Sequence, residues 1–310
     1  MTSSALNLFK ALSDETRLRL MALLSVYELS VNELTALLNM GQSRISRHLK
    51  ILSAAGLLQF RRDGLWVFYS FPPEGNGREF WLDVRKYVQE SQDLQPQIKS
   101  DLTLAAGIIR ERTVKTRQFF NAIAEDWDEL SQELLAGFDL PARVLDLAPE
   151  NALAVDLGCG TGYMLERLLG KSRRVIGVDG SPQMLELARR RLAPFKERVS
   201  LRIGELEHLP LADREADFAV ISMVLHHMEE PESVIRETRR VLAPGGSLLI
   251  ADLLKHKKEE MRSKYGDRWL GFESAYLESL LEGFRKITTE IQPLKNGLEV
   301  ALILAERRAD

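Results

Sequence analysis

The sequence predicts an α/β protein, and three patterns along the chain support that fold class. Residues 5–71 form short amphipathic helical segments followed by a β-rich hairpin, and residues 78–136 are helical almost throughout, with breaks expected near Pro96 and Gly107. Residues 153–306 alternate short apolar runs with amphipathic helical stretches, which is typical of a mostly parallel sheet. At about 150 residues per domain, 310 residues suffice for two domains. We expect a head at 1–75, a helical connector at 76–114 and a sheet domain at 115–310.

The composition is that of an ordinary globular protein, with 45% hydrophobic and 28% charged residues and a formal net charge of −3. No stretch approaches the roughly 18 consecutive apolar residues of a membrane span, and the first residues lack the pattern of a secretory signal. The single cysteine cannot form an internal disulfide or, alone, a thiolate metal cage. We therefore expect a soluble, cytoplasmic protein with no membrane contact and no metal site.

Two helices of the head have the spacing of a helix-turn-helix. Ser30 and Glu33 form an S-x-x-E capping box that begins a helix at 31–38. A tight break at 39–41 separates this helix from another at 42–56. Polar and basic side chains gather at the start of this last helix, which is the part that reads base edges in the major groove.

A basic hairpin follows the second of these helices. Residues 57–71 contain two β-rich runs joined at Asp63-Gly64, a strong hairpin turn, and we expect Arg61 and Arg62 at its tip. Arg and Gln can read base edges, and Ser and Lys hold phosphates. The predicted DNA-binding residues are Gln42, Ser43, Arg44, Ser46, Arg47, His48, Arg61 and Arg62.

Residues 5–71 resemble the winged helix of the arsenic-resistance-repressor (ArsR) family through LFKALSDETRLRLMALL, ELSVNEL, SRISRHLKILSAAGLL and RRDGLWVFYSF. The resemblance implies a homodimer that binds double-stranded DNA at a palindromic operator, with residues 81–94 as a candidate dimer helix. Metal-sensing members carry cysteines where Ser30 and Asn32 stand here, so that mode is not supported. A protein-interaction module is the alternative interpretation of the head.

A glycine-rich turn follows a predicted buried strand at 153–155. Asp156 ends this strand, and Gly158, Gly160 and Gly162 allow a tight turn before the next helix. A dinucleotide-binding site would favour G-x-G-x-x-G, with a pyrophosphate at the helix N-terminus. The carboxylate of Asp156 would repel a pyrophosphate and suits a cationic ligand end instead.

A second acid, Asp179, ends the next strand about 17 residues after Gly162, where it can accept hydrogen bonds from a ribose diol. Further predicted strands follow in the ranges 199–211, 216–231 and 232–253. From about residue 115 to 308 the series resembles the class I S-adenosylmethionine-dependent methyltransferases. The resemblance implies a Rossmann-like, seven-stranded, mostly parallel sheet that ends in an antiparallel hairpin.

The same resemblance implies S-adenosyl-L-methionine as cofactor and S-adenosyl-L-homocysteine as product. Phe119, Phe120 and Trp127 are candidates to cover the cofactor, although each could equally serve in core packing. The predicted cofactor-binding residues are Asp156, Gly158, Cys159, Gly160, Gly162, Asp179, Gly180, Ser181, Met184, Glu205, Leu206 and Ser222.

Methyl transfer requires alignment with the acceptor and a water-poor site, and an oxygen or nitrogen acceptor can also need a base. The catalytic residue is not identified; the candidates are His226, His227 and Asp252, and the resemblance favours a structural role for His227. The Asn-Pro-Pro-Tyr loop of amino-methylating nucleic-acid enzymes is absent. Thiol-dependent arsenic methylation is disfavoured, because Cys159 is the only cysteine.

Three functions fit these motifs. The first is a methyltransferase that acts on a small molecule and is fused to an ArsR-type transcription regulator. The second is a transcription regulator whose methyltransferase-like domain senses S-adenosylmethionine or S-adenosylhomocysteine without turnover. The third is modification of DNA or of a DNA-bound protein, with the head as an address tag.

Overall fold

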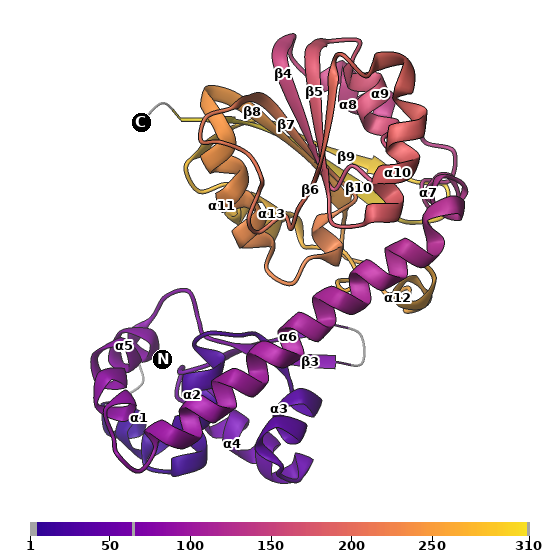
Figure 1. The fold of residues 1–310 in the computed structure, drawn as a ribbon. Coiled ribbons are helices and arrows are strands. Elements are labelled where there is room, and N and C mark those ends of the chain that lie inside the picture. Colours follow the sequence, from indigo (N-terminus) through magenta and orange to yellow (C-terminus); the bar gives the residue numbers. More distant parts are fainter. Residues whose placement is uncertain (1–4, 64–65, 309–310) are drawn as a thin grey trace. The chain divides into compact units, whose positions relative to one another are not determined.

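The structure, a computed structural model, describes residues 5–63 and 66–308. The chain divides into two compact units, Met1–Thr113 and Val114–Asp310, and the long helix α6 (Gln95–Ile123) contributes residues to both (Figure 1). Within the described ranges, no helix combines the length and the apolar composition that crossing a bilayer requires.

The first unit is mainly helical with a small antiparallel sheet. Its sheet has the order β1-β3-β2, with β1 at Leu29–Ser30, β2 at Gln59–Asp63 and β3 at Trp66–Ser70. The expected turn at Asp63-Gly64 lies partly outside the described residues. The helices are α1 (Ala5–Leu12), α2 (Glu15–Leu24), α3 (Val31–Leu38), α4 (Gln42–Ala54), α5 (Asn76–Gln89) and the first part of α6.

Side-chain caps define where the helices of this unit begin. The Ser30 hydroxyl accepts a hydrogen bond from the Glu33 backbone N–H, and the Glu33 carboxylate accepts one from the Ser30 backbone N–H, so the predicted capping box of α3 is confirmed. Asp14 caps α2 by accepting from the Arg17 backbone N–H at 3.0 Å. Asn39, in the left-handed conformation, ends α3 and allows the chain to turn into α4.

The helices that follow the hairpin pack on the same core as the head. Trp81 of α5 and Ala105 of α6 are buried in the hydrophobic cluster that α2, α3 and α4 form. The Arg19 guanidinium pairs with both oxygens of buried Asp101 at 2.7 and 2.9 Å, which fixes α6 against α2. The expected helix break near Gly107 is wrong: α6 continues through it, because an interior glycine only weakens a helix by about 1 kcal/mol.

The second unit is built on a seven-stranded sheet with the order β6-β5-β4-β7-β8-β10-β9. The first five strands in this order are parallel, whereas β10 is antiparallel to both β8 and β9. The predicted mostly parallel sheet with a C-terminal antiparallel hairpin is therefore confirmed. The strands are β4 (Asn151–Leu157), β5 (Ser172–Asp179), β6 (Val199–Ile203), β7 (Ala216–Ser222), β8 (Leu242–Leu253), β9 (Phe284–Pro293) and β10 (Glu299–Arg307).

Helices cover both faces of this sheet and bury one hydrophobic cluster on each (Figure 1). On one face lie α7 (Trp127–Leu134), α8 (Leu140–Leu147), α9 (Tyr163–Leu168) and α10 (Pro182–Arg191). On the other lie α11 (Pro231–Val241) and α13 (Ser274–Ser279), while α12 (Glu260–Lys264) follows β8. The carboxyl ends of β4, β5, β7 and β8 share one edge of the sheet, which is where ligands bind in open α/β folds.

Candidate functional site

The glycine loop after β4 is shaped by three residues in the left-handed backbone region. Gly158, Gly160 and Gly162 have φ values of 80°, 50° and 80°. A Cβ atom on Gly158 would lie 2.5 Å from the side chain of Val224, and one on Gly162 would lie 2.9 Å from Leu192. Both conformation and space therefore require glycine at these two positions.

Asp179 connects the glycine loop to the loop after β5. Its carboxylate accepts hydrogen bonds from the backbone N–H groups of Gly160 and Ser181, both at 2.8 Å. Burial raises the pKa of Asp179, although these two hydrogen bonds oppose the increase. Since an ionised carboxylate has about four acceptor positions, Asp179 can still accept from a ligand hydroxyl.

Asp156 lies buried at the end of β4, and its Oδ2 has no hydrogen-bond partner among the described residues. Burial and the neighbouring Asp179 raise the pKa of Asp156 to about 8. A buried polar atom without a partner is costly in an apolar environment. The site therefore fits a ligand whose cationic end would pair with Asp156 and stabilise its ionised form.

Most of the other predicted cofactor residues lie around the same loop. Ser181 caps α10 by accepting from the Met184 N–H at 3.1 Å, and its hydroxyl donates to Asn121 Oδ1 at 2.6 Å. Gly180 lies close to the Glu205 carboxylate, which forms an ion pair with Arg117. Of the remaining members, Cys159, Met184 and Leu206 are buried and Ser222 is half-buried at the end of β7.

Cys159 is buried within the glycine loop. Burial, followed by the charges of Asp179 and Asp156, raises the pKa of its thiol well above the usual value. The thiol therefore stays protonated, and the residue fills space in the turn rather than acting as a nucleophile.

Aromatic residues from the end of α6 and the start of α7 lie against the loop. The indole of Trp127 lies 3.6 Å from where a Cβ of Gly160 would be. Phe120 packs edge-on against both Trp127 and His227, with ring centroids 5.3 and 4.8 Å apart. Phe119 in turn packs against Phe120, 5.4 Å away. Trp127 therefore reaches the loop directly, and Phe120 and Phe119 are connected to it through Trp127.

A polar cluster at the glycine loop joins Thr161, Asp128 and Arg191, and no motif in the sequence predicted it. The Thr161 hydroxyl donates to Asp128 Oδ1 at 2.5 Å, and Arg191 donates to Thr161 Oγ1 at 2.9 Å and pairs with Asp128. The three residues lie on separate elements, and only the tertiary fold brings them together.

His226 and Asp252, two of the catalytic candidates, form a buried pair. His226 Nδ1 lies 2.6 Å from Asp252 Oδ1, and Asp252 also accepts from the backbone N–H groups of Val224 and Leu225 at 3.2 and 2.8 Å. Burial alone would lower the pKa of His226, but Asp252 and Asp267 outweigh burial and raise it to about 9. These contacts favour a role for both residues in holding the loop after β7.

His227, the third candidate, has an unusual environment. Its Nδ1 lies 3.1 Å from the Gly266 carbonyl oxygen, while its buried Nε2 has no hydrogen-bond partner within residues 5–63 and 66–308. Burial, and then the charge of His226, lowers the pKa of His227 well below its usual value. The ring is therefore neutral at physiological pH.

Helix α4 presents most of the predicted DNA-binding residues to solvent. Gln42, Ser43, Arg44 and Arg47 are exposed and Ser46 is half-buried. Exposed Lys50 lies one turn beyond Ser46 and Arg47 on the same face, and the sequence-based list omitted it.

Two residues of that list do not lie where we expected. His48 is buried, because it neighbours the inward stripe of α4 and faces Asp14 at 3.6 Å, and burial lowers its pKa. Arg61 lies in the middle of β2 and pairs with Glu28 at 2.6 Å while covering the ring of Phe68. Successive strand residues point to opposite faces, so of the two wing arginines only Arg62 is exposed.

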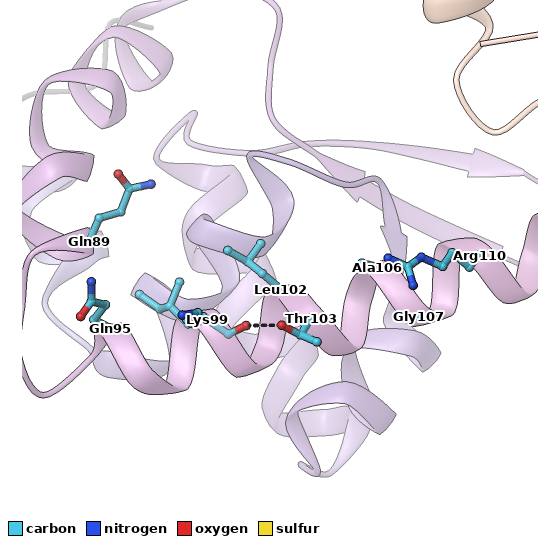
Figure 2. Close-up of a pocket in the computed structure, with 9 residues that line it drawn as sticks. Gln89, Gln95, Lys99, Leu102, Thr103, Ala106, Gly107 and Arg110 are labelled. Carbon is cyan, nitrogen blue, oxygen red and sulfur yellow. Dashed lines mark hydrogen bonds between the residues drawn. The ribbon is translucent and has the colours of Figure 1, made fainter. Parts of the chain in front are cut away.

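An open groove in the first unit is separate from these sites (Figure 2). It lies between the end of α5 and one side of α6, with a volume of about 500 Å³. Its lining is a mixture of amide, aliphatic and basic side chains, among them Gln89, Leu102 and Arg110.

Two family models match separate parts of the chain. Residues 14–59 match the bacterial regulatory protein, arsR family, and residues 155–250 match a methyltransferase domain. A solved complex of the Haloferax volcanii Trm112 methyltransferase activator and a methyltransferase contains a similar fold, with 20% identity and a TM-score of 0.53. The alignment covers 61% of this chain and 98% of that one.

Curated relatives match about half of the chain. An uncharacterised 37.1 kDa protein in transposon TN4556 of Streptomyces fradiae is 40% identical over 55% of this chain and 53% of its own length. The Thermotoga maritima demethylmenaquinone methyltransferase is 29% identical over 56% of this chain and 79% of its own. The Halobacterium salinarum arsenite methyltransferase is 34% identical, over 40% of this chain and 32% of its own. The chain thus spans about half the length of the Streptomyces protein and a third of the Halobacterium enzyme.

Proposed function

We propose that this chain, which joins an arsR-family helix-turn-helix segment to a methyltransferase domain, is an S-adenosylmethionine-dependent methyltransferase fused to a DNA-binding transcription regulator. The acceptor is proposed to be a small molecule, as the named acceptors of the matching relatives suggest. The observation that carries the proposal is the glycine loop beside the buried, unpartnered carboxylate oxygen of Asp156.

The residues around the loop account for binding of each part of the cofactor. Asp156 would pair with its amino group, Asp179 would accept from its ribose hydroxyls, and the adenine would lie beside Glu205 and Leu206. The glycines permit close approach of the backbone. The bound cofactor supplies an electrophilic methyl group on its sulfonium. Gly180, Ser181, Met184, Cys159 and Ser222 complete the proposed lining.

Calorimetry on the full chain with S-adenosylmethionine and S-adenosylhomocysteine tests this assignment. We expect saturable binding of both compounds, weakened in Asp156→Asn, which keeps the shape of the side chain but removes its charge. Absence of binding by the unsubstituted chain would refute the assignment. Transfer of label from the cofactor to a panel of small acceptors, with operator DNA included, then separates small-molecule methylation from modification of DNA.

The head, proposed at residues 1–75, would bind DNA through α4 and Arg62. The helices at 76–114 would contribute to a homodimer that recognises a palindromic operator. Large apolar side chains stand exposed on α1 and α5, namely Leu6, Phe9 and Tyr87 at 61, 59 and 66%. Such exposure supports a partner surface there. Sedimentation of the full chain tests the dimer, and a monomer at all concentrations would refute it.

The sensing function remains the second candidate, and one observation favours it. Asp252 accepts from His226 Nδ1 and from the Leu225 N–H, so its carboxylate is committed to holding the loop after β7 rather than to proton abstraction. Regulation by sensing requires that DNA-competent and DNA-incompetent states differ in cofactor affinity. An operator affinity that changes with S-adenosylmethionine or S-adenosylhomocysteine would support sensing, and an unchanged affinity would exclude it.

A further inference from the structure

Three buried side chains in the second unit bring nitrogen and oxygen ligand atoms together. His226, His227 and Asp267 each offer one atom, and these atoms lie within 4.8 Å of one another. His226 Nε2 and Asp267 Oδ1 are 3.7 Å apart. This separation is too long for a hydrogen bond. It is close to the distance of about 3.4 Å that separates two ligand atoms bound to one tetrahedral ion by bonds of about 2.0–2.2 Å.

The other ring nitrogen of each histidine is held by an acceptor. His226 Nδ1 donates to the Asp252 carboxylate at 2.6 Å, and His227 Nδ1 donates to the Gly266 carbonyl oxygen at 3.1 Å. A carbonyl oxygen can only accept, so His227 Nδ1 is the donor to Gly266, and Nε2 is the ring nitrogen left to face a ligand. Carboxylates and backbone carbonyls hold metal-binding imidazoles in the same way.

We propose that His226, His227 and Asp267 bind a divalent first-row transition metal ion, with Asp252 and the Gly266 carbonyl orienting the two imidazoles. Two imidazoles and a carboxylate suit Zn²⁺ or Fe²⁺, whereas Mg²⁺ and Ca²⁺ prefer oxygen ligands throughout. Binding displaces any proton on His226 Nε2 to solvent. The proposal departs from the expectation of no metal site that the sequence supported.

An ion pair without metal explains only part of this arrangement. Attraction between His226 and the carboxylates of Asp252 and Asp267 explains why these three side chains lie close together. It leaves buried His227 Nε2 without a hydrogen-bond partner in the described part of the chain, and a buried unsatisfied polar atom calls for a water or an ion. A metal ion supplies the partner for His227 as well as for His226.

The site lies beside the proposed cofactor loop. His226 and His227 follow β7 directly, and Val224 of the same segment packs against Gly158. Phe120 contacts both His227 and Trp127, and Trp127 lies over Gly160. Three protein ligands leave one coordination position open, which a water can occupy. If the proposed methyl transfer holds, an oxygen or nitrogen atom of the acceptor can take that position.

Titration of the untagged, chelator-treated full chain with Co²⁺ tests the proposal in the absence of cofactor. We expect visible d–d absorption bands that saturate at one equivalent per chain and disappear when Zn²⁺ is added. His227→Gln and Asp267→Asn should each weaken Co²⁺ binding by at least about 10-fold, since each removes a ligand. His208→Gln, which alters an exposed histidine of the same unit, should bind Co²⁺ unchanged.

Circular dichroism of the metal-free variants shows whether each one folds. If His227→Gln does not fold, the nearly isosteric Asp267→Asn variant tests the metal site. No saturable binding by the unsubstituted chain, or undiminished binding by the folded variants, would overturn the metal site. Calorimetry with S-adenosylmethionine on the same preparation reports separately on the proposed function, so the two proposals can fail independently.

Discussion

Helix α4 and the glycine loop after β4 are both encoded by short contiguous sequences, but they are completed differently. The exposed side chains of α4 stand on one helix and face solvent without help from another segment. The glycine loop is held by Asp179 from the end of β5 and is closed by Asp128 from α7. We therefore expect substitutions in α4 to act singly, and substitutions around the loop to disturb several partners together.

The largest expected effect concerns buried Asp252. Asp252→Ala removes the partner of buried His226 and the acceptor for backbone N–H groups of the loop after β7. Breaking such a pair typically lowers the free energy of unfolding by about 3–5 kcal/mol. Urea denaturation of the full chain measures this loss in the free energy of unfolding, with Asp213→Ala at an exposed aspartate as the matched control. A loss no greater than that of the control would show that the pair is not stabilising.

The next effect concerns cofactor affinity. Asp179→Ala removes the acceptor of the Gly160 and Ser181 N–H groups together with the proposed ribose contact. Since hydrogen bonds to charged groups contribute about 1.5–3 kcal/mol, we expect about 100-fold weaker S-adenosylmethionine binding in calorimetry. Operator affinity should be unchanged. If operator binding alone were lost, the assignment of the two sites would be reversed.

The raised pKa of Asp156 predicts a dependence of stability on pH. The folded chain retains this proton up to about pH 8, whereas the ordinary carboxyl pKa is 3.8, so the folded state binds more protons between these values. The proton retained on Asp156 therefore stabilises the folded chain fully below about pH 4. As the pH rises from about 4 to about 8, this contribution to the free energy of unfolding falls by at most about 1.4 kcal/mol per pH unit.

Urea denaturation at a series of pH values compares the unsubstituted chain with Asp156→Asn, which lacks this titration. Asp179 is present in both proteins, so the difference isolates Asp156. Parallel stability profiles for the two proteins would show that Asp156 ionises normally in the folded chain.

The smallest effect concerns operator binding. Arg44→Ala should weaken binding to an operator selected from random duplexes by about 10-fold at fixed salt, since one base contact contributes about 1–3 kcal/mol. Cofactor binding should not change, and exposed Arg189→Ala in the other unit provides the control. Affinity should also fall as salt rises. Equal operator affinity in the two variants would remove Arg44 from the interface.

Local patterns predicted local features well. The capping box of Ser30 and Glu33 depends on residues three apart, and the turn at Gly158, Gly160 and Gly162 depends on backbone freedom that only glycine has. The break expected at Gly107 failed because the cost of one glycine is small beside the packing of the rest of α6.

Contacts between distant segments could not be predicted in this way. Helical spacing did not reveal that His48 faces Asp14, nor strand patterning that Arg61 pairs with Glu28. Both depend on how separate elements pack. The same is true of Asp267, which no motif singles out and which lies beside the histidines only because the loop after α12 returns to the edge of the sheet.

The sequence by itself determined the order of elements along the chain, the capping box of Ser30 and Glu33 and the position of the glycine turn. These depend on residue periodicity and on backbone conformation, which act over a few residues. Only the tertiary structure decided which buried charges meet, because the free energy of a buried charge depends on neighbours that the chain brings from far away. The unpartnered oxygen of Asp156 and the meeting of His226, His227 and Asp267 are properties of the folded chain.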